Sequence, residues 1–172
     1  MRKPFLAILC VCMALLLLGC SLTRYSSMDA EEMLKLSDDN LVIGLVLQLG
    51  TKDFSELNES QKVVYAAASL EMQVRNDGLV HFLSNECKGA APYICVALET
   101  LGAAKHLALL QADLTKNKVD LTDLSVFDTS ELDAFSKLNE LYDFSDLEGS
   151  YKSLPSLPQY IRAYMQAHLE DF

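Results

Sequence analysis

The chain has 172 residues, with 24 acidic against 14 basic side chains and a formal net charge of −10. A hydrophobic fraction of 51% and a charged fraction of 22% allow a buried core and exclude a disordered chain. Seven Gly and four Pro exclude a collagen-like or Pro-rich chain. The excess of carboxylates argues against direct binding to nucleic acid, because affinity for phosphates comes from Lys and Arg. The length suits one domain plus a targeting segment.

The first 20 residues have the organisation of an export signal. Met1-Arg2-Lys3 is positively charged, and residues 5–18 form an uncharged run that is short for a membrane span. The run leads into Leu17-Leu18-Gly19-Cys20, which resembles the bacterial lipobox. This resemblance implies a signal peptide over residues 1–19 and a lipidated N-terminus at Cys20. The alternatives are an ordinary secretory signal or an N-terminal anchor.

Residues 20–28 are short and polar, and we interpret them as a tether. Loss of the signal peptide leaves 12 basic against 24 acidic residues. A lipoprotein carries two or three acyl chains, which are enough for stable attachment to a membrane. We therefore expect a lipid-anchored protein of the bacterial cell envelope. Ser21 follows the lipidated residue, and resemblance to sorted lipoproteins implies the outer membrane, facing the periplasm, if the host is Gram-negative.

The remaining residues, 29–172, show helical periodicity and almost no strand signal. The run 41–47 is β-branched enough to form a strand, but no other segment offers it a partner. No period of 20–50 residues repeats. The sequence thus predicts a single compact all-α domain of several helices. The expected helices span 29–36, a second one capped by Asp38 or Asp39 and closed by Gly50, and then 59–76, 79–83, 92–102, 103–115, 130–141, 145–149 and 159–169.

The clearest of these helices spans residues 59–76. Asn58 precedes it and Gln61 stands three residues later, a pattern typical of a capping box. Apolar residues recur at helical spacing from position 63 to position 74, whereas Lys62, Glu71 and Arg75 can face outward.

Asn76-Asp77-Gly78 ends this helix. These residue types adopt left-handed backbone angles at little cost, so we predict that the chain reverses within three residues. The alternative is a polar loop, built from Asn76, Asp77 and Asn85, that receives a ligand.

Two cysteines remain in the domain, Cys87 and Cys95, on either side of a segment that contains Gly89 and Pro92. In an oxidising compartment we expect them to form a disulfide. The alternative is a pair of buried thiols that act as small hydrophobic groups. No second Cys or His pair stands at metal-ligand spacing.

Several stretches resemble one bacterial family, the DNA-mimic-protein-19-like proteins. The resemblance covers roughly residues 55–170. It is carried by LNESQKV at 57–63, by LEMQVRNDGLVHFLSN at 70–85, by ALETLGA at 97–103, by Leu141-Tyr142, by Tyr151 and by YIRAY at 160–164.

The family is named for an acidic member that mimics DNA toward a transcription factor, so the resemblance implies a helical fold and a possible role as a DNA mimic. The chain departs from the family pattern at Asp77 and Leu79, which stand where members carry a Gly and an aromatic residue.

No motif of an enzyme is present. The histidines, His81, His106 and His168, fall on three different expected helices and none has a partner four residues on. Walker and nucleophile-elbow patterns are missing from the sequence. Cys87 could pair with a histidine as a nucleophile, but the disulfide is the favoured reading. We expect no catalytic residue, no cofactor and no metal ligand.

The segment 120–148 concentrates the negative charge, because Lys137 is its only base. Spaced carboxylates on a surface can steer a basic protein partner. The alternative is a solvated face that keeps the domain soluble. A Ca²⁺ loop is disfavoured, because the Gly and terminal Glu of an EF-hand are missing. The candidate partner-binding residues are Asp120, Asp123, Asp128, Glu131, Asp133, Glu140, Asp143, Asp146 and Glu148.

Three hypotheses of function follow. The leading one is a membrane-anchored, non-enzymatic interaction protein, for example an immunity-type protein, that binds a basic protein. The second is a DNA mimic that binds a DNA-binding protein. The third is an enzyme or ligand-binding protein with an unrecognised site.

Overall fold

Helix α4 (Glu59–Asn76) is the element around which the others pack. The Asn58 side chain accepts a hydrogen bond from Gln61 N at 2.8 Å, and Asn58 N donates one to Gln61 Oε1 at 3.3 Å. The capping box marks the start of the helix, and both ends, Glu59 and Asn76, lie where the sequence predicts them. Twelve of its 18 residues are buried, which is more than one face of a helix provides, so α4 is enclosed on several sides.

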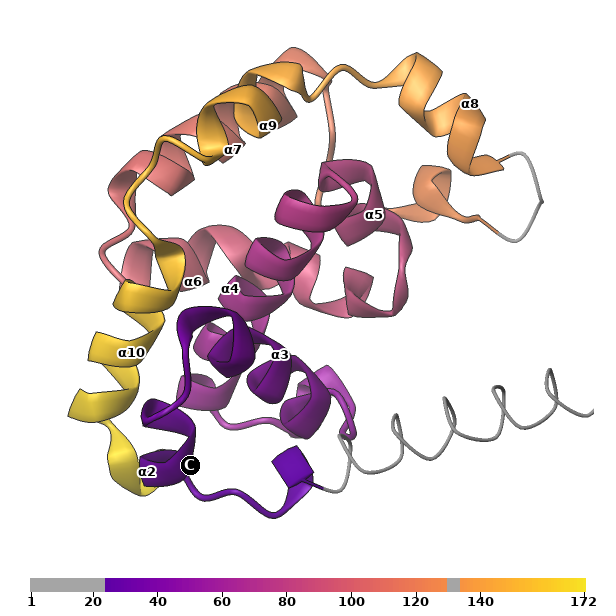
Figure 1. Ribbon diagram of the computed structural model, residues 1–172. Helices are drawn as coiled ribbons and strands as arrows, with labels where there is room; N and C mark the ends of the chain where they lie inside the picture. Colours follow the sequence, from indigo (N-terminus) through magenta and orange to yellow (C-terminus); the bar gives the residue numbers. More distant parts are fainter. Residues whose placement is uncertain (1–23, 130–133) are drawn as a thin grey trace, which may run out of the picture.

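The computed structural model describes residues 24–129 and 134–172 (Figure 1). The N-terminal part contains α2 (Ala30–Leu34), α3 (Asp38–Leu49) and the 3₁₀ helix η1 (Phe54–Glu56). The run 41–47 is helical, as expected, and lies within α3. α3 packs along α4, and α2 packs on α3 and on the C-terminal helix.

The chain reverses at Gly78, as predicted. Asp77 N and Gly78 N both donate to Gln73 O, at 2.8 and 2.9 Å, and Gly78 has a φ of +90°. The chain continues through α5 (Leu79–Ser84), the 3₁₀ helix η2 (Glu86–Tyr93) and α6 (Ile94–Thr100). All three pack against α4.

The second half of the chain forms a layer over this centre. α7 (Ala104–Lys116) lies beside α9 (Ser145–Tyr151), and α10 (Leu157–Ala167) packs against α2, α3 and α4 (Figure 1). The 3₁₀ helix η3 (Ser125–Phe127) and α8 (Ala134–Leu141) pack on α5. The expected helix 130–141 is thus seen over 134–141, and its first four residues lie outside the described part of the chain.

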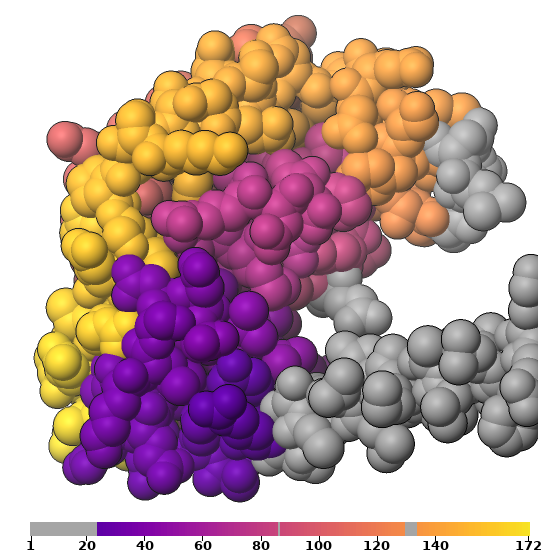
Figure 2. All heavy atoms as spheres, viewed as in Figure 1, coloured from indigo at the N-terminus to yellow at the C-terminus, as the bar shows by residue number. Residues whose placement is uncertain are grey.

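The C-terminal residues return to the start of α4, through the 3₁₀ helix η4 (Leu169–Asp171). Asn58 Nδ2 donates to Asp171 O at 2.7 Å, and Ser60 Oγ donates to Asp171 Oδ2 at 2.6 Å. A carboxylate at this end of α4 also complements the helix dipole. The space-filling view in Figure 2 shows the N-terminal helices and α10 side by side at the surface.

The fold class is the one that the sequence predicts. The described residues form one all-α domain in which no strand occurs. The expected signal peptide (residues 1–19), Cys20 and the first residues of the expected tether lie outside the described residues.

Candidate functional site

The first group of candidate acidic residues surrounds η3. Asp120 Oδ1 accepts hydrogen bonds from Thr122 N and Thr122 Oγ1, at 2.8 and 2.7 Å, and Asp123 Oδ1 accepts one from Ser125 N at 3.1 Å. Hydrogen bonding by the side chains of Thr122 and Ser125, and then by their backbone N–H groups, holds the pKa of Asp120 and of Asp123 below the usual value. Asp128 is exposed nearby. The turns therefore fix charged side chains in place at the surface.

The second group lies at the start of α9. Asp143 Oδ1 accepts from Ser145 Oγ at 2.5 Å, which together with Lys116 holds its pKa well below the usual range. Lys116 Nζ lies 2.8 Å from Asp146 Oδ2 and 2.9 Å from Asp143 Oδ2. One ammonium group thus offsets two carboxylates, and its own pKa is raised by them, by Asp146 most. Ion pairs this exposed contribute little to stability.

Glu140, Asp143 and Glu148 line one cavity of about 270 Å³, together with Val80. Glu148 has a structural role that the sequence does not suggest, because its Oε1 accepts from Leu79 N at 2.9 Å and so caps α5. Glu131 and Asp133 lie outside the described residues. The structure therefore divides the described candidates into two groups, and several of them also stabilise turns or helix ends.

A buried polar cluster lies inside the domain, where α4, α7 and α9 meet. The Glu71 side chain is only 3% exposed, although helical spacing predicts an outward position. Tyr151 OH donates to Glu71 Oε2 at 2.8 Å. The other oxygen, Oε1, forms an ion pair with Arg75 Nε at 2.5 Å but accepts no aligned hydrogen bond. Burial raises the pKa of Glu71, against the effect of Tyr151 and Arg75.

His106 belongs to the same cluster. Its ring is 1% exposed and meets the Tyr151 ring edge-on at 5.4 Å between centroids. Nδ1 is buried and has no hydrogen-bond partner among the described residues. Burial, and then the Arg75 charge, lower the pKa of His106 below its usual value. The sequence did not predict this burial, because His106 stands alone, with no second histidine at helical spacing.

An open groove, here called the α3–α4 groove, runs outward from Glu71. It is a cavity of about 370 Å³ lined by Asp39, Val42, Ile43, Met72, Arg75 and the buried carboxylate of Glu71. Ile43 is one of the few large apolar side chains at the surface, at 39% exposure. The groove therefore combines an apolar wall with two carboxylates and one guanidinium.

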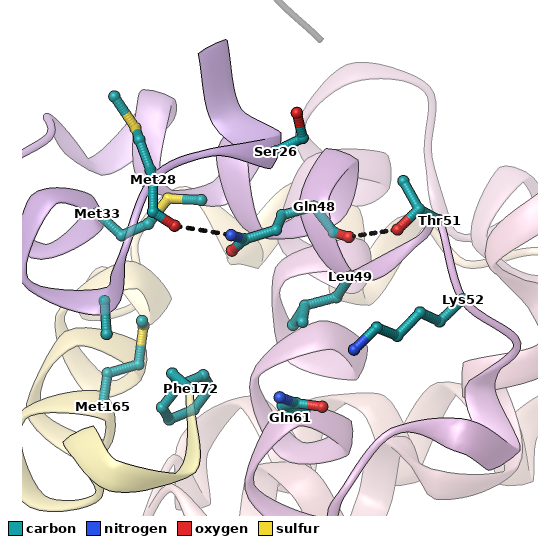
Figure 3. Close-up of a pocket in the computed structure, with 11 residues that line it drawn as sticks. Ser26, Met28, Met33, Gln48, Leu49, Thr51, Lys52, Gln61, Met165 and Phe172 are labelled. Atoms are coloured by element: carbon teal, nitrogen blue, oxygen red, sulfur yellow. Dashed lines mark hydrogen bonds between the residues drawn. The ribbon is translucent and has the colours of Figure 1, made fainter. Parts of the chain in front are cut away.

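Another cavity, of about 280 Å³, opens between α2, α3 and the C-terminal residues (Figure 3). Met33, Leu49 and Met165 form its apolar side, and the Lys52 side chain extends into it. Gln48 closes one end, where its Nε2 donates to Met28 O at 2.8 Å. Gln48 and Thr51, on the polar side of this cavity, thus form hydrogen bonds within the domain.

The expected disulfide does not form in the structure. Cys87 and Cys95 are both free thiols. The segment between them is 3₁₀ helix rather than an open turn, and it directs Cys87 inward, where Tyr65 OH lies 3.9 Å from its sulfur. Cys95 is half-buried on α6, and burial raises the pKa of its thiol. The alternative interpretation, two thiols packed as small hydrophobic groups, fits this arrangement.

Within residues 24–129 and 134–172, none of the helices has the length and apolar character that crossing a bilayer requires. A protein-family model described as DMP19-like protein matches residues 55–168, from η1 to the end of α10. Neither the curated proteins nor the solved structures yield a match. The matched region is well over half of the chain and nearly coincides with the resemblance seen in the sequence, so the chain belongs to the family of DMP19-like proteins.

Proposed function

We propose that this chain is a non-enzymatic protein-binding module that uses exposed, fixed carboxylates to recognise a basic protein. The observation that carries the proposal is the hydrogen bonding of Asp120, Asp123 and Asp143 by the Ser or Thr two residues later. Such bonds keep the carboxylates charged and hold their positions. A partner then meets a negative surface that needs little ordering when it binds.

Association with a basic partner should depend strongly on salt. Electrostatic steering raises association rates and weakens as the Debye length falls from about 10 Å at 0.1 M to about 3 Å at 1 M. A partner would be captured from envelope extract and identified, and its association rate then measured across this range of salt. We expect the rate to fall with salt and to fall further in the variant Asp120→Asn, Asp123→Asn, Asp128→Asn.

Asn keeps the oxygen that accepts the turn hydrogen bonds, so this variant changes charge rather than fold. The matched control is Glu31→Gln, Glu99→Gln, Glu170→Gln, which removes three exposed charges elsewhere in the domain. A salt-insensitive rate, or an equal loss in both triple variants, would contradict the proposal and leave segment 120–148 as a solvated face.

We further propose that the module is held at the cell envelope by lipid on Cys20. Its support is the lipobox after a charged and then an apolar segment. In the variant Cys20→Ala, we expect the precursor to stay uncleaved and to incorporate no labelled fatty acid. The wild-type chain treated with an inhibitor of the lipoprotein signal peptidase serves as control. Normal cleavage and membrane retention of the variant would refute the anchor.

Family membership favours a second function, that of a DNA mimic directed at a DNA-binding protein. The two proposals differ in compartment, because DNA-binding partners are cytoplasmic whereas a lipidated domain lies outside. A cytoplasmic pool of unprocessed chain, together with a captured partner that DNA displaces, would favour the mimic.

A further inference from the structure

We infer that the α3–α4 groove receives the side chain of a lysine on the basic partner protein. This inference rests on the proposed function and assigns to one groove a part in recognition that lies outside segment 120–148. It is carried by the shape of the groove, by its charge and by the exposed carboxylate of Asp39.

The wall of the groove suits an aliphatic stem. Val42, Ile43 and Met72 line it, and Ile43 remains 39% exposed in the free protein. The volume of about 370 Å³ accommodates a chain of four methylene groups with room to spare. Covering the exposed part of Ile43 with such a stem removes apolar surface from water, which favours binding.

The charge of the groove selects a cation. Asp39 is exposed and has no ion-pair partner among the described residues, whereas its neighbour Asp38 is paired with Arg162 at 2.9 Å. Glu71 adds a second carboxylate, and Arg75 is the single base in the lining. An anion would therefore meet two carboxylates, whereas an ammonium group meets a net negative site.

The Asp39 carboxylate is the acceptor that an ammonium group can reach. Asp39 is exposed, whereas Glu71 Oε1 is buried and lies 2.5 Å from Arg75 Nε. A lysine ammonium is a compact head on a flexible aliphatic stem, so it can pair with Asp39 while the stem lies on Ile43.

The inference is tested with n-butylammonium, which reproduces a lysine side chain, by titrating the isotope-labelled full chain in a non-ionic detergent and recording amide shifts. We expect shifts centred on residues 39–43 and 71–76 and a dissociation constant on the order of 10 mM, as befits so small a ligand. Methylammonium, which lacks the stem, and n-butanol, which lacks the charge, should each bind at least about 5-fold more weakly.

The variant Asp39→Asn should weaken n-butylammonium binding about 5-fold, and Ile43→Ala about 3-fold. The matched control is Asp77→Asn, which removes an exposed carboxylate just beyond the end of α4 and should leave binding unchanged. Shifts centred elsewhere, equal binding of methylammonium, or equal effects of Asp39→Asn and Asp77→Asn would each overturn the inference.

The affinity of the captured partner for two variants distinguishes a failure of this inference from a failure of the proposed function on which it rests. If its affinity falls with Asp120→Asn, Asp123→Asn, Asp128→Asn but is unchanged by Asp39→Asn, the groove is refuted and the acidic surface stands. If Asp39→Asn weakens the partner and the triple variant does not, the groove stands and the role of segment 120–148 is refuted.

Discussion

The Glu71 carboxylate is held inside the domain by one neutral donor, Tyr151 OH, and one cation, Arg75. A buried carboxylate without partners is costly, because it loses its hydration and gains nothing in return. The Tyr151 hydroxyl therefore matters more to stability than a typical surface hydrogen bond. It also ties α9 to the centre of the domain.

Removing this hydroxyl should destabilise the fold. We expect Tyr151→Phe to lower the free energy of unfolding by about 1–3 kcal/mol, because it leaves Glu71 Oε2 buried without a donor. Urea denaturation followed by circular dichroism measures this change. Tyr142→Phe is the control, because the Tyr142 hydroxyl has no hydrogen-bond partner among the described residues and its ring stays packed on Phe127. Equal losses in the two variants would show that the bond to Glu71 contributes nothing.

At the scale of elements, Gly78 is the point at which α4, α5 and α9 meet. Its φ of +90° is open to Gly and rarely to other residues. A Cβ at this position would lie 2.6 Å from Glu148 Oε1, the same oxygen that caps α5 through Leu79 N. Any side chain here would disturb both the backbone and the cap.

Gly78→Ala should therefore lower the free energy of unfolding by about 1–3 kcal/mol, from backbone strain and displacement of Glu148. Gly89→Ala is the matched control, because a Cβ there meets no atom within 4 Å and the backbone is not left-handed. We expect that variant to stay within about 0.5 kcal/mol of wild type. Chemical denaturation of both variants provides the comparison, and a neutral Gly78→Ala would refute the structural role of Glu148.

The elements also show how far the sequence predicts this fold. The bounds of α4 follow from local signals, a capping box at Asn58 and a reversal at Gly78, so they were predictable. The position of Glu71 was not, because outward spacing on one helix does not reveal that other helices cover that face. Likewise, Glu148 and Cys87 have partners, Leu79 and Tyr65, that are distant in the sequence.

At the scale of the whole molecule, two buried groups give the stability opposite dependences on pH. The pKa of Glu71 is raised by burial, so its contribution to stability is fully present below about 4.5 and is lost as pH rises toward its folded value. The pKa of His106 is lowered by burial, so its contribution is present above about 6.5 and is lost as pH falls toward its folded value.

The second effect can be isolated with His106→Gln. Below pH 6.5 the unfolded wild-type chain binds a proton at His106 that the folded chain resists, whereas the variant has no such group. We expect the unfolding free energy of wild type minus that of the variant to fall as pH falls from 7.5 to 5.0, whatever its sign at pH 7.5. Urea midpoints across this range measure it, with His168→Gln as control. A difference that is constant with pH would refute the lowered pKa of His106.

The contact between Asp171 and the first turn of α4 affects the order in which the domain folds during synthesis. Ser60 and Asp171 are 111 residues apart, and a ribosome adds about 5–20 residues per second, so Asp171 is made about 6–22 s after Ser60. A helix itself forms within about a microsecond. During those seconds, the amides of the first turn of α4 should exchange with solvent while its later turns begin to be protected. The start of the central helix is thus among the last parts of the nascent domain to become stable.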